Sequence, residues 1–401
     1  MVCQDIKKGQ KASYACIIDV HGRSELPARP DTPLQRRTGK PSPARGSHIM
    51  VTESSKIDIK DLSRQQLADW LKDRGRRPFR TDQILRWVYL RQADRFDDMT
   101  NIAKPLRTGL EAAFVNPRLQ VESEAVSQDG SRKLLFRLHD GLHIETVIIP
   151  EKDHFTLCIS SQVGCRHGCR FCMTAKGGFV RNLSAGEIIS QVRDVLHQVN
   201  AQGGMPLTNI VFMGMGEPLA NYENVVQALA TITNGNWGLK ISTRRVTVST
   251  AGLVPQMADL GRDTQVNLAV SLNATDDDTR TRLMPINRKY PIADLMAACQ
   301  RYPLPPRRKI TFEYILIKGV NDSMADAERL VKLLRPIKAK INLIPFNEHP
   351  GSNFRRPDPA RISQFQELLA EHHYTVMVRH SKGQDIGAAC GQLRARLRSE
   401  N

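Results

Sequence analysis

Three cysteines lie close together in the middle of the chain. Cys165, Cys169 and Cys172 have the spacing C-x3-C-x2-C, and Gly164 and Gly168 give their loop freedom to turn. Three thiolates can ligate three irons of a [4Fe–4S] cluster, whereas a complete ferredoxin cluster takes four cysteines. The spacing therefore favours a cluster that keeps one iron open.

An open iron offers a place for a substrate to bind. S-adenosylmethionine (SAM) can chelate it through its amine and carboxylate, and an electron from the cluster then leaves a 5′-deoxyadenosyl radical. The alternative is a structural zinc site, which usually takes four closed ligands in paired C-x2-C spacing. The sequence has no second pair, and His167 could be a fourth ligand only from inside a cramped loop. The triad thus favours a radical SAM enzyme.

Composition limits the class of protein. The chain has 401 residues, 40% hydrophobic and 25% charged, which is long enough for two or more domains. We find neither a run of about 18 apolar residues nor a secretory leader, and therefore expect a cytoplasmic protein with no membrane partner. Eight cysteines could suggest disulfides, but their clustering and the missing leader favour metal or redox chemistry.

The net charge of +17 suits a polyanionic partner, most often nucleic acid. The plainer interpretation is a basic but unspecialised surface. Residues 1–49 carry nine basic and four acidic side chains, five prolines and little apolar periodicity. We interpret them either as a disordered basic extension or as an artefact upstream of a functional start at Met50.

Two parts of the sequence are expected to form the elements that position the cysteines. Residues 50–130 are expected to form a helical RNA-binding accessory domain. Within it, residues 55–125 read as helical, with helices starting near Ser63, Thr81 and Pro105. The basic linker 74–80 could touch a phosphate backbone or be a solvated turn. Residues 131–150 should be a β-hairpin linker, with strands at 132–138 and 142–149.

Strands and helices then alternate through a radical SAM core at residues 151–380. Strands are expected at 154–160, 209–213, 244–249, 266–271, 310–317 and 341–345. Helices are expected near 184–200, 222–234, 252–260, 292–301, 323–335 and 358–373. Ser184 and Glu187 form a capping box for the first helix. Such β-α units predict a parallel sheet, and no Gly-rich dinucleotide fingerprint follows the first strand. We therefore expect an α/β fold, a partial (β/α)6 TIM-like barrel, ending in a C-terminal segment, residues 381–401.

In barrels the chemistry sits at the C-terminal ends of the strands. Residues 213–218 end the second strand, where a Gly-rich edge and Glu217 would suit the SAM amine. Further polar groups follow other strands, namely Ser249, Ser271, Asn273 and Asn347. Each alone is more typical of a helix cap or a turn, but a shared rim favours a ligand site.

Several motifs in one order give the chain its family resemblance. It resembles the RlmN family of radical SAM RNA methyltransferases over about residues 55–400. The motifs lie at residues 158–165, 178–183, 214–218, 284–287, 344–347 and 388–393.

The resemblance implies methylation of carbon 2 of adenosine in 23S rRNA and in tRNA, next to the anticodon. It implies a [4Fe–4S] cluster, two SAM molecules per turnover, and a reductant such as flavodoxin; we expect a monomer. Cys390 would be methylated first, Cys158 would complete turnover, and Glu145 would accept a proton. The family's SAM contacts map onto Gly216, Glu217, Ser249, Ser271, Leu272, Asn273 and Asn347.

The chemistry is reasonable, because carbon 2 of adenine is not nucleophilic whereas a thiolate can take a methyl group from SAM. Without the resemblance, Cys390 would read as a small buried residue and Cys158 as an apolar strand residue. Basic segments at 76–80, 307–309 and 355–356 could grip phosphates or be a solvated surface. Two rivals remain: the related Cfr type, which methylates carbon 8, and a non-catalytic metal-containing RNA-binding protein.

Overall fold

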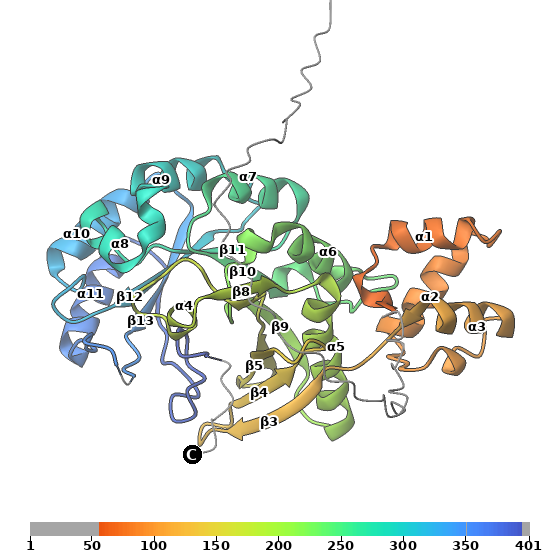
Figure 1. Ribbon diagram of the computed structural model, residues 1–401. Helices are drawn as coiled ribbons and strands as arrows, with labels where there is room; N and C mark the ends of the chain where they lie inside the picture. Colours follow the sequence, from red (N-terminus) through yellow and green to blue (C-terminus); the bar gives the residue numbers. More distant parts are fainter. Residues whose placement is uncertain (1–55, 350, 395–401) are drawn as a thin grey trace, which may run out of the picture. The chain divides into compact units, whose positions relative to one another are not determined.

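Parallel strands joined by helices make up most of the computed structural model, which describes residues 56–349 and 351–394 (Figure 1). The parallel strands are β6 (Phe155–Cys158), β9 (Leu207–Phe212), β10 (Val246–Thr250), β11 (Asn267–Ser271), β12 (Ile310–Leu316), β13 (Ala339–Pro345) and β14 (Val376–Val378). The helices between them are α5 (Ala185–Gln202), α6 (Tyr222–Thr233), α7 (Val254–Asp263), α8 (Asp277–Leu283), α9 (Ile292–Arg301), α10 (Met324–Leu334) and α11 (Pro359–Glu371). The six expected strands and six expected helices of the core are confirmed; α8 and β14 are additions.

The order of the strands identifies the kind of sheet. From β6 to β14, neighbours in the sheet follow chain order without reversal, and all pair in parallel. A doubly wound sheet reverses its order at a switch point, whereas winding in one direction keeps the connecting helices on one side. Figure 1 shows α7, α9, α10 and α11 along the outer side of the strands. The fold is therefore the expected partial TIM-like barrel.

An antiparallel extension continues the sheet beyond β6. The expected hairpin is present as β4 (Arg132–Arg137) and β5 (His143–Pro150), and β5 pairs with β6. A further strand, β3 (Gln120–Val126), pairs with β4 at the edge of this ten-stranded sheet. The helical interpretation of residues 55–125 was wrong for this segment. Nearly all of β3 is exposed, so its sequence shows no apolar face.

The remainder of that stretch is mainly helical as expected, although β1 (Ile57–Asp58) and β2 (Phe114–Val115) form a short parallel pair that was not expected. Its helices are α1 (Arg64–Lys72), α2 (Phe79–Tyr89) and α3 (Lys104–Ala113). Ser63 caps α1 through a capping box with Gln66. These helices are tied to α5 by Arg193, whose fully buried guanidinium donates to the carbonyl oxygens of Val88 and Ala93, both at 3.0 Å.

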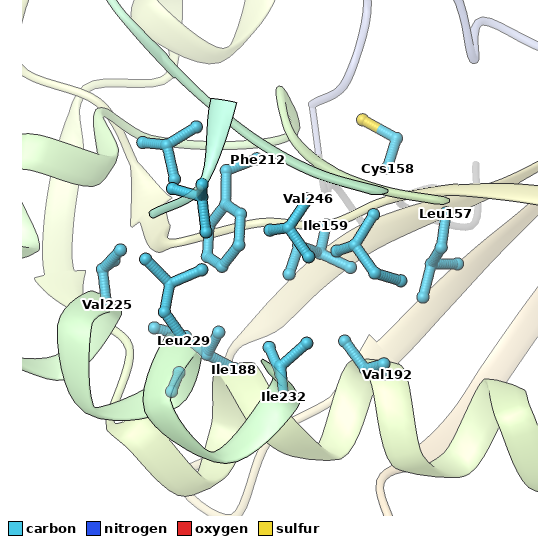
Figure 2. Packing of buried hydrophobic residues seen from close by; sticks show 14 of the residues in the cluster. Leu157, Cys158, Ile159, Ile188, Val192, Phe212, Val225, Leu229, Ile232 and Val246 are labelled. Atoms are coloured by element: carbon cyan, nitrogen blue, oxygen red, sulfur yellow. The ribbon is translucent and has the colours of Figure 1, made fainter. Parts of the chain in front are cut away.

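The apolar core lies between the parallel sheet and its helices. Figure 2 shows Leu157 and Phe212 of the strands facing Val192 of α5 and Ile232 of α6. Side chains alternate along a strand, and the Cys158 side chain points to the side of β6 opposite to that of Leu157. Cys158 therefore lies on the concave face, where a barrel keeps its chemistry.

Residues 381–394, here called the C-terminal strap, connect the two edges of the sheet. The strap leaves the β14 edge and reaches the turn between β3 and β4. There Asp129 accepts a hydrogen bond from the Gly383 amide at 2.7 Å, and Asp385 accepts one from the Ser127 hydroxyl at 2.6 Å. The open side of the partial barrel is thus crossed by the segment that carries Cys390.

Two further points concern the whole chain. No helix in the described part is long and apolar enough to cross a membrane. The expectation about residues 1–49 lies outside the described residues, as do the last seven residues of the expected C-terminal segment.

Candidate active site

The cysteine loop is held by a small antiparallel pair, β7 (Gln162–Gly164) and β8 (Phe179–Asn182), with the short helix α4 (Met173–Lys176) between. The Cys165 amide donates to the Gly178 carbonyl oxygen at 2.7 Å. A Cβ on Gly164 would stand 2.0 Å from that oxygen, so only glycine allows the two segments to meet. The loop that carries the thiols is therefore built by close backbone contact.

The three loop thiols form one donor set. All three cysteines are half-buried, and burial raises the pKa of Cys165 to about 12. Burial, followed by the charges of Cys172 and Cys165, also raises the pKa of Cys169. Thiols in such a place become thiolates only beside a strong positive charge, which bound metal supplies.

Within residues 56–349 and 351–394, no three His, Cys, Asp or Glu side chains stand close enough to enclose one metal ion. A [4Fe–4S] cluster has one iron per thiolate, so its ligands stand farther apart than those of a single ion. Three neighbouring thiols on one loop fit a cluster with one open iron. Burial lowers the pKa of His167, which favours its neutral form.

The segment 213–218 lies directly against the strand end that precedes the cysteine loop. A Cβ on Gly214 would stand 2.7 Å from the Ile159 carbonyl, and one on Gly216 would stand 2.6 Å from the Gln162 side chain. Gly216 also has φ +100°, a conformation that side chains disfavour. Both glycines are therefore required for the rim of β9 to reach the cysteine loop.

Glu217 is buried at this rim. Its carboxylate accepts hydrogen bonds from the Ala251 amide at 2.7 Å and the Leu219 amide at 3.1 Å. Burial raises its pKa to about 7, although the hydrogen bonds from Ala251, Thr250 and Leu219 oppose the shift. A cationic ligand such as an ammonium would draw this group into its charged form.

The other expected SAM contacts lie at the ends of successive strands. Ser249 is half-buried on β10, and Ser271 is the half-buried last residue of β11. Leu272 is fully buried and extends β11 by donating its amide to the Glu313 carbonyl at 3.0 Å. Asn273 has φ +58°, and its side-chain oxygen accepts from the Ile315 amide at 2.8 Å. The structure thus brings these residues to one rim.

Asn347, after β13, faces the C-terminal strap. Its Nδ2 donates to the Cys390 carbonyl at 3.4 Å. Its buried Oδ1 has no hydrogen-bond partner among the described residues. An unsatisfied buried amide oxygen is costly, so this atom is suited to a donor on a ligand.

The strap places Cys390 against the cysteine loop. The Met173 amide donates to the Gly391 carbonyl at 2.6 Å, and the Thr174 hydroxyl donates to the Leu393 carbonyl at 2.7 Å. Cys390 is exposed, yet protein surrounds its thiol closely enough that burial, with the charge of Glu313, raises its pKa to about 11. The residue therefore lies against the cysteine loop, close to Cys172.

Cys158 lies on the same concave face. It is the last residue of β6 and is 6% exposed. Burial raises the pKa of its thiol, and negative charge on Cys390 raises it further. The two thiols are thus near enough to influence each other, although 232 residues separate them in sequence.

Glu145, on β5, is bonded to the strap in this structure. Its Oε2 accepts from the Arg394 amide at 2.6 Å, and its Oε1 pairs with the Lys133 ammonium at 3.0 Å. Lys133 also donates to the Gly387 carbonyl at 3.3 Å. This carboxylate therefore holds the segment that carries Cys390.

Sequence reasoning missed the strap anchors and two interior residues. Asp129, Lys133 and Asp385 gave no signal, because their role depends on where the strap runs. Two residues on the concave face, Glu313 and Asn342, did give a signal in the sequence. Each is a buried polar residue inside a largely apolar strand, and an acidic side chain such as Glu313 is seldom buried without a reason.

Comparison with known proteins shows two family models that match the chain. The family model for the ribosomal RNA large subunit methyltransferase N-terminal domain matches residues 57–115. The model for the radical SAM superfamily matches residues 159–333.

Two of the relatives that carry the name dual-specificity RNA methyltransferase RlmN illustrate the similarity. The one from Desulfosudis oleivorans is 59% identical over 350 residues, covering 87% of this chain and 94% of that protein. The one from Geobacter sulfurreducens is 54% identical over 341 residues, covering 85% of this chain and 93% of that protein. A radical SAM methyltransferase from Sphaerobacter thermophilus has a similar solved structure, with a TM-score of 0.79, 45% identity, and coverage of 85% of this chain and 100% of that one.

A common catalytic family over nearly the whole length of these relatives excludes the non-catalytic alternative. This chain belongs to the RlmN family of radical SAM RNA methyltransferases.

Proposed function

We propose that this enzyme methylates carbon 2 of adenosine in 23S rRNA and in tRNA next to the anticodon, by way of a methylated Cys390. The observation that carries the proposal is the path of the C-terminal strap. It holds Cys390 beside the cysteine loop and on the same face as Cys158. The printed names of the relatives support an RNA substrate of two kinds.

Cys165, Cys169 and Cys172 would hold the [4Fe–4S] cluster, which when bound supplies the electron that splits SAM into methionine and a 5′-deoxyadenosyl radical. The SAM molecule would lie along the rim formed by Gly216, Glu217 and the ends of β10, β11 and β13. Glu217 would meet the SAM amine, and the unpaired Oδ1 of Asn347 would accept a hydrogen bond from the ligand.

Cys390 acts first as a nucleophile. Its sulfur forms a bond to the SAM methyl carbon while the bond from that carbon to the SAM sulfonium breaks, leaving S-adenosylhomocysteine. Because burial keeps the Cys390 thiol protonated, a base must take its proton at this step.

Cys390 then carries the carbon to the RNA. A second SAM would supply the 5′-deoxyadenosyl radical, which takes one hydrogen atom from the S-methyl group to become 5′-deoxyadenosine. The resulting methylene radical on Cys390 adds to carbon 2 of adenine. The adduct must then lose one electron, which the oxidised cluster would take back, and one proton. Glu145 is proposed to accept the proton that carbon 2 must lose. For this, its bond to the Arg394 amide has to open.

Cys158 releases the product. Its thiolate attacks the Cys390 sulfur, so a sulfur–sulfur bond forms as the carbon–sulfur bond breaks. The freed carbon keeps the electron pair and takes a proton to become a methyl group. The disulfide must be reduced before the next turnover, which requires an external reductant.

Access to an adenine inside folded RNA requires moving the base out of its stack. The net charge of +17 favours binding of the phosphate backbone. We propose that the helices of residues 50–130 form the accessory RNA-binding domain. In the basic linker between α1 and α2, the side chains of Arg76 and Arg77 are exposed and make no hydrogen bond or ion pair among the described residues.

Product analysis tests the proposal. The reconstituted enzyme, incubated with SAM, a reductant and each RNA, should yield 2-methyladenosine by mass spectrometry of the digested RNA. Formation of only 8-methyladenosine would instead assign the Cfr type of reaction.

Cys390→Ala tests the carrier role in the same assay. This variant should keep its iron and SAM binding but leave both RNAs unmethylated, because no sulfur remains to carry the carbon. Cys299→Ala, at a buried helix cysteine outside the site, is the matched control and should methylate normally.

A further inference from the structure

A buried carboxyl group on the concave face takes part in none of these steps. Glu313 lies on β12 and is 7% exposed. Its neighbours Phe312 and Tyr314 are fully buried, and the Tyr314 ring lies 5.6 Å from the Phe365 ring of α11. Side chains alternate along a strand, so Glu313 faces away from the helices and into the barrel.

Glu313 is part of a row that crosses four strands. Ser271 pairs with Glu313, Glu313 with Asn342, and Asn342 with Met377. Residues in register on parallel strands share a face of the sheet. The Met377 side chain is apolar yet 45% exposed, which shows that this end of the row faces open space rather than a packed interior.

The row lies close enough to Cys390 for Glu313 to act on its thiol. Apart from burial, the charge of Glu313 is the largest influence that raises the pKa of Cys390, and the Arg379 guanidinium acts in the opposite direction on both groups. Ser271, next to Glu313 in the row, belongs to the proposed SAM rim. Glu313 therefore lies between the place proposed for SAM and the residue that delivers the carbon.

One oxygen of Glu313 is available to a ligand. Its Oε1 accepts from the Asn342 amide at 2.8 Å, which fixes the carboxyl plane. Its Oε2 makes no hydrogen bond among the described residues. Burial raises the pKa of Glu313 to about 7, against the hydrogen bond from Asn342 and the charges of Arg379 and Lys340.

A carboxyl oxygen that is available to accept a hydrogen bond suits a purine with an amino group. The hydrogen-bond donor on the base edge of adenine is its exocyclic amine, which a carboxylate oxygen accepts. Met377, two strands from Glu313 at the open end of the same row, offers a flexible, polarizable surface for the ring. A site of this kind rejects an analogue that lacks the donor, because its own buried acceptor is then left unpaired.

We propose that Glu313, held in place by Asn342, binds the target adenine of the RNA by accepting a hydrogen bond from its exocyclic amine, with Met377 against the ring. This inference rests on the proposed function. SAM also carries an adenine, and the position of Glu313 beside Cys390 assigns the carboxylate to the RNA base instead.

Removing the amine and removing the carboxylate should have the same effect. The test uses two short RNAs that differ only at the target, one with adenosine and one with purine riboside, which has hydrogen in place of the amine. With the wild-type holoenzyme, kcat/KM for methylation should be about 10- to 100-fold lower on the purine RNA. Glu313→Ala should be about equally slow on both RNAs, because the two losses remove one interaction.

Further readouts separate this role from others. Glu313→Ala should form S-methylated Cys390 and release 5′-deoxyadenosine with an unchanged KM for SAM. Glu313→Gln, whose amide oxygen can still accept, should regain part of the preference for adenosine, and it serves as the test variant if the alanine variant loses iron. Thr311→Val, two residues earlier on the same face of β12, is the control and should behave as the wild type.

The inference is overturned if the fall in kcat/KM caused by the purine RNA and the fall caused by Glu313→Ala multiply when the two changes are combined. It is also overturned if Glu313→Ala raises the KM for SAM while keeping the preference for adenosine. Absence of any methylated adenosine with the wild-type enzyme would instead refute the proposed function itself.

Discussion

At the residue scale, the site separates side chains that were evident in the sequence from those that were not. The cysteine triad could be found by its spacing alone. Cys158 and Cys390 needed a family resemblance, because each looks structural in its local sequence. Glu313 could have been found as a charged residue inside a largely apolar strand. The face of the sheet on which its side chain lies depends on how the strands pair, and no local pattern in the sequence gives that pairing.

Glu313 should also make stability depend on pH. The folded protein keeps a proton on this carboxyl up to about pH 7, whereas the unfolded chain releases it near pH 4.5. Between these values the folded state binds more protons, so the free energy of unfolding falls as pH rises. The cost approaches about 3 kcal/mol above pH 7.

Glu313→Gln carries no such proton and should lose less stability between about pH 5 and pH 8 than the wild type does. Urea unfolding at both pH values, with equal iron content, measures the difference. An equal change in the free energy of unfolding between the two pH values in both proteins would show that burial does not shift the titration of this carboxyl group.

At the element scale, the strap is the feature that makes the site. Lys133 donates to its Gly387 carbonyl and also pairs with Glu145, which in turn accepts from Arg394. Lys133→Met should loosen both attachments. Amide hydrogen exchange in residues 381–394 should become faster, while exchange in α5 should stay unchanged.

Lys152→Met is a suitable control, because Lys152 is an exposed lysine whose side chain makes no hydrogen bond or ion pair in the described structure. Unchanged exchange in the strap of Lys133→Met would show that its backbone contacts alone hold it.

Arg193 joins two elements that are distant in the chain. Its guanidinium pairs with Asp94 at 2.7 Å and Asp194 at 2.9 Å, besides its two carbonyl acceptors near the end of α2. Arg193→Met should cost about 3 kcal/mol of stability, because the buried carbonyls and Asp194 lose their partner. Urea unfolding measures this loss.

Arg262→Met, at an exposed arginine that pairs with Asp259 on α7, should change stability little. Similar unfolding curves for the two variants would show that the buried network contributes no more than a surface ion pair.

Most core elements could be predicted because most of the parallel strands are short apolar runs and several helices begin at a clear capping signal. Ser184 and Ser323 do cap α5 and α10 as a sequence pattern can suggest. β3 could not be predicted, since an exposed edge strand needs no apolar face. The β7–β8 pair was missed because it depends on the close approach of Gly164 and Gly178, a tertiary contact.

At the scale of the whole molecule, excess positive charge should govern RNA affinity. RNA binding should weaken by about 100-fold or more between 50 and 200 mM salt, because bound cations are released when phosphates are neutralised. Replacing Arg76 and Arg77 by Gln should weaken binding and reduce the slope of log Kd against log salt by about 1 to 2. Fluorescence anisotropy with a labelled RNA measures both.

Lys332→Gln with Lys338→Gln removes the same charge from exposed positions in and after α10. An equal effect of the two double variants would mean that overall charge, rather than the basic linker, binds the RNA.

The central claim is that the new methyl carbon travels through Cys390. Its most direct test uses SAM whose methyl group carries three deuterium atoms, in ordinary water. One deuterium should leave with 5′-deoxyadenosine and two should remain on the carbon, so mass spectrometry should find 2-methyladenosine that carries two deuterium atoms. A product methyl group with all three deuterium atoms would mean intact methyl transfer and would contradict the account.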